Sequence, residues 1–224
     1  MSVADNIKRI REDIMTTCYK YNRDPNKVRL LAVSKTVPVG LINEAYTAGQ
    51  IAFGESRVQE FLIKYQTYPE FNWHFIGHLQ TNKINKVIST DFVLQSVDSL
   101  SLAEKLNQRL EEQKKSLKVL LQVNIDGDPA KFGFSPAGLW QNIEKILELK
   151  RLNVSGLMTI GALKQSSKEA RSSFAKLFLL KEALEEATKH NFSELSMGMS
   201  SDYKEAIAEG ATIVRVGTAI FGKR

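Results

Sequence analysis

A lysine stands at the end of a short apolar run, where its amine is available for chemistry. The run covers residues 28–35, which is too short for a typical helix and rich in Val and Leu, as in a buried strand. Pro38 follows, and proline suits the first turn of a helix. Lys35 is therefore expected at the carboxyl end of a strand, where α/β folds place reacting groups. Such an amine condenses with aldehydes, and partial burial would favour its deprotonated form. The alternative is a solvated lysine at a strand end.

A second group of residues has the character of an anion site. Ser200 and Ser201, with Asp202, are expected to open a helix after the seventh strand, and its free N–H groups attract anions. Gly217 and Thr218 follow the eighth strand. Gly217 allows a ligand to approach the backbone closely, and Thr218 offers a hydroxyl. Barrel folds commonly bind phosphate after these two strands. The alternative is a helix cap together with a glycine needed for packing.

Arg215 interrupts the apolar run of residues 212–216. By strand alternation it shares a face with Ile213 and Gly217, so it is expected to point inward. A buried arginine needs a partner, which is either a polar ligand atom or a carboxylate of the protein. An aldehyde that also carries a phosphate would use the lysine, the anion site and the arginine together. Pyridoxal phosphate is such a cofactor, and a sugar phosphate bound by a class I aldolase is the competing ligand.

Metal and nucleophile chemistry have weaker support. His74 and His78 are four residues apart, but they span a strand–loop boundary, so no metal site is expected. The one cysteine, Cys18, excludes an internal disulfide and a cysteine-based metal cluster. No nucleophile motif such as GxSxG occurs. We therefore predict no metal and assign no catalytic residue.

Eight apolar runs alternate with helical patterns along the chain. The expected strands cover residues 28–35, 51–55, 71–77, 92–97, 117–125, 154–160, 194–199 and 212–221. Strict alternation predicts parallel strands and a compact α/β fold, a single (β/α)8 barrel preceded by an extra helix over residues 3–21. A doubly wound open sheet is the alternative, but it should carry a glycine-rich nucleotide loop that this sequence lacks. The barrel is expected to form one domain over residues 1–224.

Composition limits the classes of partner. The chain has 224 residues, 43% of them hydrophobic, and a formal net charge of +6. No apolar run has the ~20 residues that a membrane span needs, and the N-terminus has no signal core, so a cytoplasmic protein is expected. The basic residues are scattered among acidic ones, which favours a solvated surface over a nucleic-acid site.

Several blocks of sequence carry a family resemblance. They are Ala-Val-Ser-Lys at 32–35, Phe-Gly-Glu-Ser-Arg-Val-Gln-Glu at 53–60, Trp-His-Phe-Ile-Gly-His-Leu-Gln-Thr-Asn-Lys at 73–83, Leu-Met-Thr at 157–159, Leu-Ser-Met-Gly-Met-Ser-Ser-Asp at 195–202 and Val-Arg-Val-Gly-Thr-Ala-Ile-Phe-Gly at 214–222. Together these blocks resemble the pyridoxal phosphate homeostasis protein family.

The resemblance implies a fold-type III barrel similar to the N-terminal domain of alanine racemase. It implies that Lys35 holds pyridoxal phosphate covalently, as an internal aldimine. Arg215 would meet the pyridine nitrogen. The phosphate would lie among Ser200, Ser201, Gly217 and Thr218, and Ser56 and Met197 complete the expected cofactor-binding set. The family usually has Asn in place of Ser56. Both residues are good helix caps, and Ser56 is expected to cap the next helix in a capping box with Gln59.

The resemblance also implies a function. Family members are thought to buffer or deliver the cofactor inside the cell and to affect amino-acid and keto-acid balance, without robust turnover. The expected partners are pyridoxal phosphate-dependent apo-enzymes, with no nucleic acid and no membrane. A racemase or lyase acting through the same lysine is the alternative function. The chain ends after the eighth strand, without the second domain through which racemases dimerise, so a monomer or weak dimer is expected.

Overall fold

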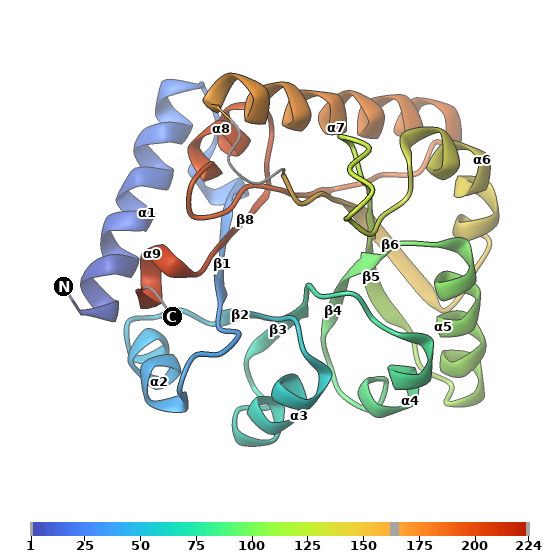
Figure 1. Cartoon of the computed structure of the whole chain (residues 1–224), viewed down its shortest axis with the longest axis horizontal. Coiled ribbons are helices and arrows are strands. Elements are labelled where there is room, and N and C mark those ends of the chain that lie inside the picture. The colour runs from blue at the N-terminus through green and yellow to red at the C-terminus, as the bar shows by residue number, and fades with distance from the viewer. Residues whose placement is uncertain (1, 162–165, 223–224) are drawn as a thin grey trace.

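The computed structural model of the chain describes residues 2–161 and 166–222. Within them, eight parallel strands pair in sequence order and close into a barrel (Figure 1), which confirms the predicted (β/α)8 fold. The strands are β1 (Arg29–Val33), β2 (Ala52–Glu55), β3 (Asn72–Phe75), β4 (Val93–Val97), β5 (Leu117–Gln122), β6 (Leu152–Met158), β7 (Glu194–Ser196) and β8 (Ile213–Val216). The α-helices are α1 (Val3–Lys20), α2 (Val39–Thr47), α3 (Val58–Thr67), α4 (Ile84–Val87), α5 (Leu100–Glu112), α6 (Pro136–Leu147), α7 (Ser167–Thr188), α8 (Tyr203–Ala208) and α9 (Thr218–Phe221).

Strand β1 closes the barrel because it pairs on both sides. Ala32 lies opposite Phe53 of β2 on one side and opposite Val216 of β8 on the other. All eight strands run in the same direction, so their carboxyl ends gather at one end of the barrel and their amino ends at the other. Residues that are far apart in the sequence are thereby brought to a common rim.

Two apolar layers hold the barrel together. Inside it, Leu31, Leu120, Met158 and Ile213 form a small buried cluster. Outside it, a much larger cluster fills the space between strands and helices. The extra helix α1 adds Ile7, Ile10, Ile14 and Cys18 to the outer cluster and lies against α9 in Figure 1. Among the described helices, none is both long and apolar enough to cross a membrane.

The last expected strand is shorter than predicted. The sequence suggested a strand over residues 212–221, whereas β8 ends at Val216 and Thr218–Phe221 form helix α9. Four residues are too few to distinguish the period of a helix from that of a strand. The helix is also fixed by a distant contact, since the Asn6 side chain donates to the Ile220 carbonyl at 2.9 Å.

A local prediction at the start of α3 was also wrong. The capping box expected at Ser56 is absent, because α3 begins one residue later than predicted. Arg57 occupies its N-cap position and makes no side-chain cap bond.

The barrel makes a prediction about two glycines. A Cβ atom on Gly156 of β6 would lie 1.9 Å from the Glu194 carbonyl oxygen of β7, whereas one on Gly40 of α2 would meet nothing within 4 Å. We expect Gly156→Ala to lower the free energy of unfolding by about 3 kcal/mol, because backbone must move to admit the methyl group. Gly40→Ala should leave stability unchanged or raise it by up to about 1 kcal/mol. Urea denaturation of both variants measures this, and equal stabilities would contradict the strand packing described here.

Candidate functional site

The carboxyl rim of the barrel collects most of the residues singled out from the sequence. Lys35 lies two residues beyond β1, and Ser56 directly follows β2. Ser200 and Ser201 lie in the β7–α8 loop, while Gly217 and Thr218 directly follow β8. Parallel strands bring these positions to one mouth. The expected partial burial of Lys35 is not found, since Lys35 is exposed there.

The turn that carries Lys35 is held by helix α3. Thr36 has a positive φ of 60°, which is unfavourable for a β-branched residue. Its N–H donates to Glu60 Oε1 at 2.5 Å, while Lys64 Nζ donates to the Ser34 carbonyl at 2.7 Å. The backbone is thus fixed on both sides of Lys35.

Lys64 is the centre of this support. Its side chain is 5% exposed, and Nζ donates to three oxygens: the Ser34 carbonyl, Glu55 Oε1 at 2.8 Å and Glu60 Oε1 at 2.7 Å. An ammonium group has three N–H donors, so this one is fully satisfied.

Glu55 is the fully buried partner of Lys64. Its Oε1 also accepts from Ser34 Oγ at 2.6 Å, whereas its Oε2 has no partner among the described residues. Burial raises the pKa of Glu55, although Lys64 and Ser34 oppose the rise. Sequence reasoning missed this cluster, because a lysine and two glutamates on or beside a helix are typical of a solvated face.

The loops after β7 and β8 are joined through Ser200. Its Oγ accepts from the Gly217 N–H at 3.2 Å and from the Ala219 N–H at 3.4 Å, at the start of α9. Gly198 permits the loop to turn, since its φ is +85° and a Cβ there would lie 2.5 Å from Ala206. The hydroxyl and N–H groups of this region form the kind of donor set that binds anions.

Arg215 is buried inside the barrel, as strand alternation predicted. Its Nη1 donates to Ser196 Oγ at 2.8 Å and its Nη2 to the Thr159 carbonyl at 2.7 Å. Among the described residues it forms no salt bridge, so the alternative of a satisfying carboxylate is not found. Burial lowers the pKa of Arg215 to about 10, which leaves it charged at neutral pH.

A chain of hydrogen bonds continues from Arg215 along the inside of the barrel. Ser196 Oγ donates to Gln95 Oε1 at 2.6 Å, and Gln95 Nε2 contacts His74 Nδ1 at 2.7 Å. Gln95 and His74 did not enter the predicted site. Each of them could have been noticed in the sequence as a polar residue at an inward-facing position of an otherwise apolar strand.

His78 and the remaining candidates are placed differently. His78 Nδ1 contacts Asp98 Oδ2 at 2.6 Å, and its ring stacks on Phe132. No cluster of three or more metal-binding side chains occurs in the described part of the chain. Met197 has no exposed surface, and its side chain belongs to the outer core. Ser56 is half-buried, with the Gly77 backbone packed closely against its carbonyl.

Comparison with known proteins decides the family. The sequence matches the family described as alanine racemase, N-terminal domain, over residues 4–224. The pyridoxal phosphate homeostasis protein of Aquifex aeolicus is 39% identical over 226 residues, covering 100% of this chain and 99% of that protein. The human protein of the same name is 37% identical over 242 residues, covering 100% and 87%. This chain belongs to the pyridoxal phosphate homeostasis protein family.

Solved structures of the family have the same fold. PipY of Synechococcus elongatus without PLP is 38% identical, with a TM-score of 0.89 and coverage of 99% of this chain and 100% of PipY. PipY with PLP bound gives a TM-score of 0.87 at 36% identity, with the same coverage. The alanine racemase of Bacillus anthracis has a TM-score of 0.73 at 18% identity. The match covers 99% of this chain and 56% of the racemase. The likeness to the racemase is one of fold.

Removal of the Lys64 amine should loosen the turn at Lys35. We expect Lys64→Met to lower the free energy of unfolding by about 3 kcal/mol or more, because it leaves Glu55 buried without its cation. The amide hydrogen of Thr36 should also exchange faster, since Glu60 is no longer held. Urea denaturation and amide hydrogen exchange measure the two effects.

Two further variants test the cause of that loss. Lys64→Met combined with Glu55→Leu should be more stable than Lys64→Met alone, because no buried charge remains. Lys204→Met removes an exposed lysine that pairs with Asp13 at 3.0 Å, and should cost less than about 1 kcal/mol. Unchanged exchange at Thr36 in Lys64→Met would show that Lys64 does not position the turn.

Proposed function

We propose that this protein binds pyridoxal phosphate at the carboxyl mouth of the barrel and serves in its homeostasis. The observation that carries the proposal is an accessible lysine, Lys35, on a turn fixed by buried charges, in a chain 36% identical to PipY with PLP bound. Residues 1–224 would act as one binding domain.

The residues at the mouth fit such a ligand. Lys35 would hold the cofactor through its amine, which can bond to the aldehyde carbon with release of one water. Ser200, Ser201, Thr218 and the Gly217 N–H would hold the phosphate through hydroxyl and backbone donors. Arg215 would face the pyridine nitrogen, with Ser56 and Met197 as further contacts.

The same residues favour a carrier over an enzyme. When bound, the cofactor supplies an electron sink, which is strongest when its ring nitrogen is protonated. Arg215 stays charged at neutral pH, so it opposes a proton at that nitrogen. Lys35, Ser201 and Thr218 are all exposed, which suits exchange of a ligand with other proteins more than exclusion of water from a reaction.

The role that we propose is buffering or delivery of the cofactor inside the cell. The protein would buffer pyridoxal phosphate or deliver it to apo-enzymes in the cytoplasm, as a monomer or weak dimer, and so affect amino-acid and keto-acid balance. It would do so without nucleic acid or membrane.

Absorption spectroscopy tests the role of Lys35. We expect pyridoxal phosphate to give the protein a new visible band because of covalent attachment at Lys35. Lys35→Ala should lose the band. Lys27→Ala should keep it, because Lys27 is an exposed lysine at the opposite end of β1. A protein that stays colourless with excess cofactor would refute the site.

The same loaded protein separates the carrier from a racemase or lyase. A carrier should exchange the α-proton of alanine or serine no faster than free pyridoxal phosphate does. Rapid exchange that is lost in Lys35→Ala would instead identify an enzyme.

A further inference from the structure

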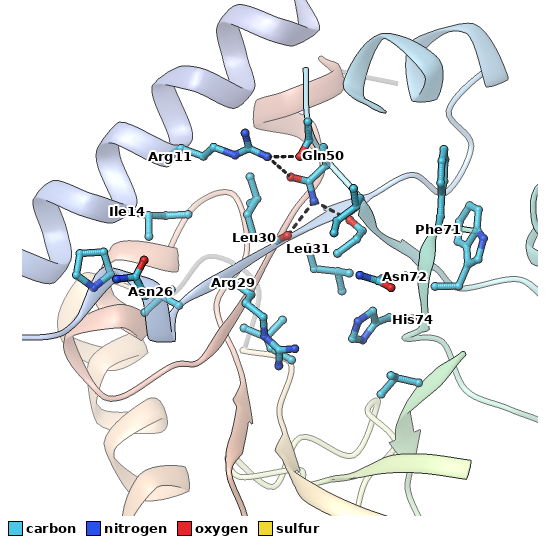
Figure 2. A pocket seen from close by; sticks show the side chains of 18 of the residues that line it. Arg11, Ile14, Asn26, Arg29, Leu30, Leu31, Gln50, Phe71, Asn72 and His74 are labelled. Atoms are coloured by element: carbon cyan, nitrogen blue, oxygen red, sulfur yellow. Dashed lines mark hydrogen bonds between the residues drawn. The ribbon is translucent and has the colours of Figure 1, made fainter. Parts of the chain in front are cut away.

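A cavity of about 770 Å³ opens at the amino end of the barrel, opposite the mouth that carries Lys35. The first residues of several strands line it, and α1 forms one side (Figure 2). These strand residues are Arg29, Ala52, Asn72, Val93 and Ile213. The size is within the usual range for sites that bind small molecules. Barrel enzymes place their chemistry at the other end, so the proposed cofactor site does not account for this cavity.

His74 lines the cavity and is 93% buried, with a relative exposure of 7%. The hydrogen-bond chain from Arg215 determines which of its nitrogens carries the proton. Arg215 donates to Ser196, whose hydroxyl donates to Gln95 Oε1, so the Gln95 amide must direct its Nε2 donor at His74 Nδ1. His74 Nδ1 is therefore an acceptor, and the ring proton is on Nε2.

The Nε2–H of His74 is a donor without an acceptor among the described residues. Figure 2 shows the ring beside Asn72 in the cavity. Because His74 lines the cavity, this donor is available to a ligand atom there that accepts a hydrogen bond.

The charges near His74 favour an anion. Glu194 pairs with two cations, Arg29 and Lys118, so the cluster carries one excess positive charge. The Arg29 side chain is 50% exposed and lines the cavity. Arg11, on α1, adds a second cation to the lining. Its guanidinium donates hydrogen bonds to uncharged oxygens of residues 48–50, which do not neutralise its charge. Asp91, two residues before β4, contributes a carboxylate to the lining.

The remaining wall of the cavity is apolar. Leu30, Leu31, Phe92 and Ile213 line it, and Leu31 and Ile213 belong to the cluster inside the barrel. A ligand that fills this space therefore needs one anionic end and a hydrocarbon body.

We propose that the amino end of the barrel binds a small carboxylic acid with an apolar body. Its carboxylate accepts from His74 Nε2 and faces Arg29, and its hydrocarbon part packs on Leu31 and Ile213. Binding at this site requires no pyridoxal phosphate, so the proposal stands apart from the proposed function.

Imidazole NMR of the full-length protein tests the site directly. The sequence has three histidines, His74, His78 and His190, so each ring can be followed. We expect 4-methylpentanoate to shift the His74 Nε2 signal in a saturable way while His78 and His190 stay in place. The uncharged 4-methylpentanamide, of nearly the same shape, should bind at least about tenfold more weakly. Equal binding of the amide, or a His74 signal that does not move up to the solubility limit of the acid, would overturn the proposal.

A matched pair of variants tests the contribution of the charge. Arg29→Gln removes the half-exposed cation of the cavity and should weaken 4-methylpentanoate binding by about tenfold or more. Arg171→Gln is the control, because Arg171 is similarly exposed at 45% and pairs with Glu209 on the outside of the barrel. Backbone amide spectra report that both variants fold. Equal affinity of Arg29→Gln and Arg171→Gln would contradict the assigned binding mode.

Discussion

The buried ammonium of Lys64 is the constraint on which the mouth of this barrel depends. It is satisfied by three oxygens from three segments: the end of β1, the end of β2 and the first turns of α3. Because a buried charge is costly without its partners, these segments can move apart only by exposing it or leaving it unpaired. The turn between Ser34 and Thr36 therefore keeps a conformation that a threonine would not adopt by itself. Lys35 projects from a rigid base although its own side chain is exposed.

Arg215 imposes a second constraint, which connects the two ends of the barrel. Its guanidinium lies inside the barrel, and its hydrogen-bond partners among the described residues are uncharged. The positive charge is therefore stabilised by the dipoles of a hydroxyl and a carbonyl group. Ser196, Gln95 and His74 continue that orientation towards the amino end. This chain of hydrogen bonds fixes hydroxyl, amide and imidazole protons in one direction. The cofactor mouth and the opposite cavity thus share one hydrogen-bonded network.

Much of the fold and of the rim of the barrel could be predicted from the sequence. Lys35 ends a clear apolar run, and the alternation of eight strands with helices favours a barrel. The rim positions of Ser200 and Gly217 then follow from the strand ends. The support of Lys35 could not be predicted, because Lys64 and Glu60 have the spacing of an ordinary solvated helix pair. Helix α9 was mistaken for part of a strand, because a segment of four residues is too short to show a period. Gln95 and Ser196 were missed because their partners are brought together by barrel closure, far from them in sequence.

The central claim is that the fixed, exposed amine of Lys35 is the point of attachment for pyridoxal phosphate. Borohydride reduction of the loaded protein, followed by proteolysis and mass spectrometry, tests it most directly. We expect a phosphopyridoxyl group on Lys35 at close to one equivalent per chain, with the other lysines unmodified. Modification at a different lysine, or spread among many surface lysines, would contradict it.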